Sequence, residues 1–114
     1  MARKLLFALL TLASCSKGPQ ADLQYISQAR SLAAEWALNN EQSSGGKINA
    51  TYTHVMRQDL REQLQTTAKS LTQPTSRYGQ EIQAILKDPD DASPQELRSH
   101  AEQLKQIEDS LESA

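Results

Sequence analysis

The sequence of 114 residues contains one cysteine, Cys15, and only five aromatic residues. A single cysteine excludes a disulfide within the chain and any metal site built from several thiolates. The longest run, from Leu5 to Ala13, is apolar except for Thr11 and ends before Ser14, well short of the roughly 20 residues that a membrane-spanning helix needs. With so few aromatic side chains, the core of any folded domain must be thin.

Sequence motifs for nucleophilic or phosphate chemistry are also missing. There is no Gly-x-Ser-x-Gly turn, no glycine-rich phosphate loop and no pair of carboxylates in an apolar setting. Glu35 precedes Trp36, but helical periodicity turns Glu35 towards Ser31 and Gln28, as expected of a solvated carboxylate. We therefore expect no enzymatic activity.

The chain begins with a segment that is typical of a secretory signal peptide. Arg3 and Lys4 supply positive charge, the short apolar run follows, and the run ends in Leu12-Ala13-Ser14-Cys15. These last four residues resemble the lipobox of bacterial lipoproteins, which has leucine three positions before the cysteine and small residues between. The resemblance covers only the first 15 or so residues, but the motif is specific.

The lipobox implies a covalent lipid and a location. In that family a diacylglyceryl group is attached to the equivalent of Cys15, a signal peptidase cuts between Ser14 and Cys15, and the new amino terminus is often acylated as well. The lipid bilayer is then a partner through Cys15, and no separate cofactor is expected. Ser16 stands where lipoproteins retained in the inner membrane tend to have aspartate, so the resemblance implies the outer membrane, with the protein facing the periplasm.

The sequence after Ser14 has an uneven charge distribution. Residues 15–46 carry two basic and three acidic side chains, residues 47–80 five and two, and residues 81–114 three and nine, giving −1, +3 and −6. The acidic balance argues against nucleic acid as a partner. The acidic end either faces the basic middle or is solvated.

The sequence predicts an all-α domain over residues 21–114, preceded by a signal peptide (1–14) and by the lipidated cysteine with its short tether (15–20). Apolar residues recur at helical spacing in four segments, namely 21–42, 49–72, 76–86 and 94–111. The Ser-Ser-Gly-Gly cluster, Pro74 and the stretch 88–92 separate them. Ser93-Pro94-Gln95-Glu96 has the composition of a capping box. We expect a small bundle built on an antiparallel helical hairpin of the first two helices, with a short helix and a C-terminal helix docked on it.

Aromatic residues and arginines supply the candidate interaction sites. Tyr25, Trp36 and Tyr52 are candidate anchors for another envelope protein, because aromatic side chains concentrate interface energy. Arg57 and Arg61 lie one turn apart at the border of the second helix's apolar face. Two such arginines suit contact with lipid phosphates or with an acidic partner.

The simpler interpretation of the two arginines, which we favour because such contacts are common, is a surface ion pair with Glu102 or Glu108 of the last helix, or plain solvation.

The two histidines each have two interpretations, one functional and one purely structural. His100 lies in the apolar stripe of the last helix, with Glu96 four residues earlier. This arrangement suits either a pH switch or a histidine that donates a hydrogen bond at a helix seam. His54 is interpreted in the same way. Because the histidines stand on different predicted helices, no metal site is predicted.

These patterns predict a small membrane-anchored envelope lipoprotein with a non-enzymatic binding or structural role. Lipoproteins of phage-lysis cassettes and of conjugation systems are an alternative by size and lipobox alone, although a compact bundle argues against a lysis protein that must bridge two membranes. A membrane-surface lipid-binding module acting through Arg57 and Arg61 is a second alternative. The third, an envelope enzyme or metal carrier, requires His54 and His100 to lie close together.

Overall fold

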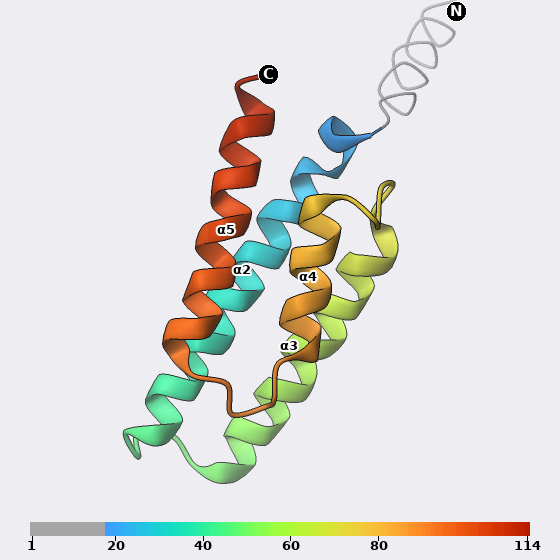
Figure 1. Cartoon of the computed structure of the whole chain (residues 1–114). Coiled ribbons are helices and arrows are strands. Elements are labelled where there is room, and N and C mark those ends of the chain that lie inside the picture. The colour runs from blue at the N-terminus through green and yellow to red at the C-terminus, as the bar shows by residue number, and fades with distance from the viewer. Residues whose placement is uncertain (1–17) are drawn as a thin grey trace, which may run out of the picture.

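A computed structural model describes residues 18–114, which form four α-helices and no β-strand (Figure 1). The helices are α2 (Pro19–Ser44), α3 (Ala50–Ser70), α4 (Arg77–Lys87) and α5 (Pro94–Glu112). The predicted all-α bundle is confirmed, and each helix begins and ends within two residues of its predicted bounds. Among the described helices none is both long enough and apolar enough to cross a membrane.

Short polar side chains define where three of the helices begin. The side chain of Asn49 accepts a hydrogen bond from the backbone N–H of Tyr52 (2.7 Å) at the start of α3. The Ser76 and Ser93 side chains cap α4 and α5 in the same way. Each cap satisfies a backbone donor that has no partner within the helix, so these starts are encoded locally.

Helix α2 is the centre of the bundle and contacts α3, α4 and α5 (Figure 1). The predicted α2–α3 hairpin is present, but α2 packs more extensively against α5 than against α3. Three alanines of α2, Ala29, Ala33 and Ala37, are fully buried, and such small side chains allow neighbouring helices to approach closely. The larger buried side chains of the core are Ile26, Leu32, Trp36, Leu60, Leu64, Leu71, Tyr78, Ile82, Ile85, Leu97, Leu104 and Ile107.

The bundle has two distinct ends. The start of α2, the α3–α4 turn and the end of α5 lie together at one end (Figure 1). The Gln20 side chain donates to the carbonyl of Leu111 (2.8 Å), and the Thr72 hydroxyl donates to the carbonyl of Gly18 (3.2 Å). We call this the tether end, and the opposite end, which carries the α2–α3 turn at residues 45–49, the far end.

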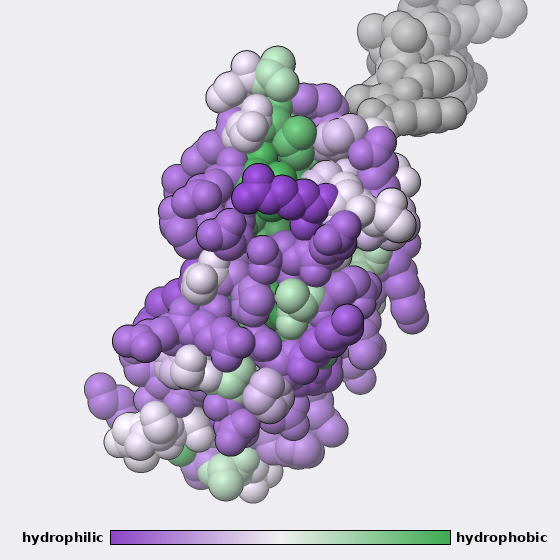
Figure 2. All heavy atoms as spheres, in the orientation of Figure 1, coloured by the Kyte–Doolittle hydropathy of each residue, from purple (hydrophilic) through white to green (hydrophobic). Residues whose placement is uncertain are grey.

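The face seen in Figure 2 is mostly hydrophilic. Its hydrophobic residues are visible mainly as a narrow strip beside α5 near the tether end (Figure 2). Polar side chains therefore cover most of the core on this side, as expected of a helical bundle in water.

Candidate functional site

Side chains of α2 and α3 hold the α4–α5 loop (residues 88–93) in place. The indole N–H of Trp36 donates to the carbonyl of Asp90 (3.0 Å). The Asn40 amide donates to the carbonyls of Asp90 (3.1 Å) and Ala92 (2.8 Å). A loop whose carbonyls are bonded to buried side chains has little freedom to move.

Arg61 adds a second set of bonds to the same loop. Its guanidinium donates to the carbonyls of Leu86 (2.7 Å) and Asp88 (3.0 Å), and it forms an ion pair with Asp90 (2.8 Å). The guanidinium carbon also lies 4.8 Å from the centroid of the Trp36 ring, within cation–π range. Arg61 is therefore committed to internal contacts.

Several predicted interaction residues have internal roles instead. Trp36 is fully buried, so the prediction that it anchors a partner is wrong: its ring fills the core and its N–H holds the loop. Arg57 donates to the Asn40 side chain (2.9 Å). Among the described residues neither arginine forms an ion pair with Glu102 or Glu108: Arg61 pairs with Asp90, and Glu108 pairs with Arg30 (3.2 Å).

The two tyrosines have different surroundings. Tyr25 is half-buried and lines a shallow groove between α2 and α3. Tyr52 is 51% exposed near the far end, where Leu38 (48%) and Val55 (56%) are the other large exposed apolar side chains of the described residues. Of the three predicted aromatic anchors, Tyr52 is therefore the most accessible.

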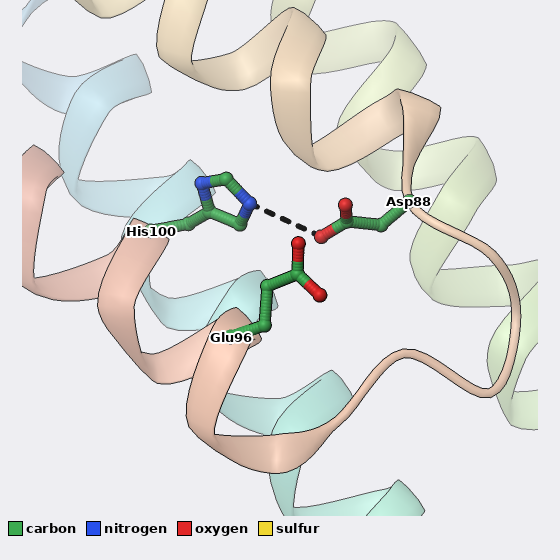
Figure 3. A group of neighbouring side chains, drawn as sticks. All are labelled: Asp88, Glu96 and His100. Carbon is green, nitrogen blue, oxygen red and sulfur yellow. Dashed lines mark ion pairs between the residues drawn. The ribbon is translucent and has the colours of Figure 1, made fainter.

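His100 lies at the centre of a cluster of carboxylates (Figure 3). Its Nδ1 is 2.5 Å from a Glu81 carboxylate oxygen of α4, and its Nε2 is 3.1 Å from Oδ2 of Asp88 at the start of the loop. Glu96, one turn before His100 on α5, points its carboxylate towards the same space (Figure 3). The cluster thus unites α4, the loop and α5.

Two atoms in this cluster are buried without a hydrogen-bond partner. They are Nε2 of His100 and Oδ2 of Asp88, which face each other but lack the geometry of a hydrogen bond. Such atoms are uncommon, because an unpaired buried polar group is costly. The arrangement can hold a cation between the two atoms.

The sequence contained part of the signal for this cluster. Glu96 and His100 stand at i and i+4, which places them on the same face of a helix. From the sequence this pair is interpreted as a pH switch or as a histidine that donates a hydrogen bond at a helix seam, and not as metal ligands. Glu81 and Asp88 carried no local signal. His54 is exposed and belongs to no group of three or more potential ligands among residues 18–114. It lies on α3, which makes no close contact with α5, the helix of His100, so these residues give no support for a site that joins the two histidines.

Asp22, a residue the sequence analysis did not single out, is a fully buried carboxylate near the tether end. It accepts hydrogen bonds from the Tyr78 hydroxyl (2.5 Å) and from the backbone N–H groups of Thr72 and Gln73. Burial alone raises the pKa of Asp22, but these hydrogen bonds outweigh it and hold the pKa below its ordinary value. Burial and the Asp22 carboxylate raise the pKa of Tyr78 to about 12. Asp22 therefore ties α2 to the α3–α4 turn.

The chain matches no protein-family model, and neither curated proteins nor solved structures provide a match. The predicted lipidation site Cys15 and the cleavage position after Ser14 lie outside the described residues.

Proposed function

We propose that the chain is a lipid-anchored protein of the bacterial envelope with a non-enzymatic binding role, attached to the outer membrane and facing the periplasm. The observation that carries this proposal is the lipobox Leu12-Ala13-Ser14-Cys15, whose cysteine stands three positions before Gly18. Gly18 is buried, and its carbonyl is bonded to Thr72.

The short connection supports a fixed orientation of the bundle. Three residues reach at most about 10 Å when extended, which is less than the reach of the tether expected over residues 15–20. In the proposed arrangement the tether end is next to the bilayer and the far end extends into the periplasm. Tyr52 and Val55, both more than half exposed, are then available to another envelope protein.

The alternative of a lipid-binding module acting through Arg57 and Arg61 has little support. Both arginines donate to groups within the bundle. Their contacts with Asn40 and Trp36 place them about 27–33 Å along α2 from Gly18, at 1.5 Å per residue. They therefore lie far from the tether end.

Lipidation of Cys15 is tested by labelling bacteria that express the chain with radioactive palmitate. We expect labelled protein in the membrane fraction, because two or more acyl chains hold a protein firmly at a bilayer. Cys15→Ser removes the acceptor thiol and should abolish the label. Ser16→Ala, next to the thiol, should retain it and serves as the matched control.

Two results contradict the proposed anchor. The first is palmitate labelling that persists in Cys15→Ser. The second is recovery of the native protein from the soluble fraction with Met1 still present and the Cys15 thiol unmodified, as read by mass spectrometry.

A further inference from the structure

We propose that His100, Asp88 and Glu96 bind a divalent metal ion of the zinc class, and that Glu81 orients the imidazole. The proposed ligand atoms are Nε2 of His100 and one carboxylate oxygen from each acid (Figure 3). The proposal does not depend on the lipid anchor.

The spacing of the ligand atoms fits a bound ion. Zinc lies about 2.0–2.2 Å from nitrogen and oxygen ligands, so neighbouring ligand atoms are about 3.0–3.4 Å apart in octahedral or tetrahedral geometry. Nε2 of His100 and Oδ2 of Asp88 are 3.1 Å apart. One ligand atom from each of the three residues lies within 4.8 Å of the others, and Glu96 is exposed, so its side chain is free to close the remaining gap.

The unpaired atoms point to the same conclusion. Nε2 of His100 and Oδ2 of Asp88 are both shielded from water, and neither has a hydrogen-bond partner. The side chains that carry them are only 17% and 11% exposed. A metal ion between the two atoms satisfies both at once. Without an ion, their only interaction is the 3.1 Å ion pair, which requires a protonated imidazole.

Glu81 provides the outer-shell contact that metal-binding histidines usually have. Its carboxylate lies 2.5 Å from Nδ1 of His100. A hydrogen bond at Nδ1 fixes the orientation of the ring and leaves the electron pair of Nε2 available to bind a metal. Glu81 is thus a positioning residue and not a ligand.

Two local features prepare the carboxylates for the ion. Arg61 holds the backbone of Asp88 through its carbonyl (3.0 Å), so this ligand is fixed before any ion arrives. At the start of α5, the Ser93 side chain accepts a hydrogen bond from the backbone N–H of Glu96 (3.1 Å). In a complete capping box the Glu96 carboxylate would also accept from the backbone N–H of Ser93, and among the described residues this second hydrogen bond is absent. The capping box is half formed, and the carboxylate turns towards His100 instead.

Charge also favours a cation here. Glu81, Asp88 and Glu96 surround one imidazole, and in residues 18–114 no lysine or arginine forms an ion pair with any of the three. Imidazole nitrogen suits zinc and neighbouring transition metals, while an all-oxygen site suits magnesium or calcium. The mixed set therefore favours zinc, with water completing its coordination.

The test is titration of Zn²⁺ into the full chain carrying Cys15→Ser, purified in a mild detergent and followed by calorimetry. Cys15→Ser removes the only thiol, so that it cannot bind zinc, and it keeps the test separate from lipidation. We expect saturable binding of one ion per chain, with no comparable binding of Ca²⁺. Glu96→Gln, made in this background, should weaken zinc binding about tenfold or more, since even outer-shell changes typically cost 10–100-fold.

Glu102→Gln is the matched control, because Glu102 is exposed on the same helix and lies outside the cluster. It should bind zinc like the parent, and circular dichroism should show both variants folded. Absence of saturable zinc binding to the parent overturns the proposal and leaves His100 as an ion-pair partner of Glu81 and Asp88. Equal affinity in Glu96→Gln and Glu102→Gln also overturns it. Loss of binding only in Glu112→Gln would place the ion in the acidic group at the end of α5 and contradict the proposed site.

Discussion

At the scale of single residues, the structure explains how buried charge is tolerated in a small core. Asp22 has no exposed surface and is surrounded by donors from three residues of the α3–α4 region. Charged hydrogen bonds of this kind are stronger than neutral ones, so the ionised carboxylate is stable there. Because α2 begins only three residues earlier, the same contact fixes the tether end.

Asp22→Asn should destabilise the bundle. One of the two acceptor oxygens becomes an NH₂ group, which itself donates and cannot accept the hydrogen bonds from Thr72, Gln73 and Tyr78. We expect a loss of about 1–3 kcal/mol in the free energy of unfolding near neutral pH. The pKa of Asp22 is lowered by folding, so its stabilisation is complete above the unfolded value of about 3.9 and is lost as the pH falls through the folded pKa. Urea unfolding at pH 7 and at progressively lower pH measures both effects.

Asp59→Asn is the control for Asp22→Asn, since Asp59 is exposed and bonds only to the nearby Gln63 side chain. Its substitution should change stability by about 0.5 kcal/mol or less. A difference between Asp22→Asn and the parent that stays constant down to acid pH would show that the charge of Asp22 contributes nothing to stability.

At the scale of elements, the turn between α3 and α4 depends on close packing. Gly79 lies in the first turn of α4, against the backbone of Pro74, and a Cβ atom at Gly79 would lie 2.2 Å from the Pro74 carbonyl oxygen. The obstacle is backbone that is itself held by the Ser76 cap and the bonds to Asp22. Glycine therefore permits this turn to be as short as it is.

Gly79→Ala should destabilise the protein although alanine is the better helix former by about 1 kcal/mol. The clash with the Pro74 backbone forces the turn to shift. We expect a cost at the upper end of the about 1–3 kcal/mol that is typical of overpacking, which outweighs the helix gain and leaves a net loss of stability. Thermal and urea unfolding measure the change. Gly45→Ala is the control, because Gly45 has φ of −80° and only ordinary contacts, and it should be neutral or slightly stabilising.

If Gly79→Ala proves as stable as the parent while Gly45→Ala behaves as expected, the close approach to Pro74 is not a constraint on the fold. The positions where the helices begin and end depend less on tertiary packing than this turn does, because caps and helix-breaking residues act within a few residues of the chain. Asn49, Ser76 and Ser93 are each followed by a helix, as their residue types favour.

At the scale of the whole molecule, the proposed anchor and the observed bundle give a specific orientation. Gly18 and the α3–α4 turn lie at one end, and Tyr52 and Val55 lie near the other. From Val55 to Leu71 the chain advances about 24 Å along α3, at 1.5 Å per residue. If the tether end lies next to the bilayer, Val55 is therefore about 24 Å farther from the membrane surface than Leu71, a difference that is large enough to measure.

Single-cysteine variants of the lipidated protein test the orientation. Cys15 is blocked by its lipid in the proposed protein, so Thr75→Cys and Val55→Cys each offer one thiol for a spin label. Paramagnetic ions attached to lipid headgroups shorten the relaxation time of a nearby spin label. We expect a strong effect on the label at position 75 and a weak effect on the label at position 55. Equal relaxation at both positions would mean that the bundle lies flat on the membrane, and the reverse order would mean that the far end faces it.

Features with a local physical cause could be predicted from the sequence. Helical periodicity and the Ser93 cap involve residues three or four positions apart, so the four helices were predicted within two residues of their bounds. Trp36 was misjudged because periodicity places a residue on a face but does not say which neighbour covers that face. Its partner, the carbonyl of Asp90, is 54 positions away.

The sequence by itself determined the all-α class, the positions of the helices and the lipobox on which the proposed anchor rests, because each follows from residues close together in the chain. The tertiary structure decided which helix covers α2 most, which aromatic is buried and how Glu81, Asp88, Glu96 and His100 converge. That convergence depends on the path of the α4–α5 loop, which is held by Trp36, Asn40 and Arg61 from distant helices. Such contacts exist only once the helices have packed.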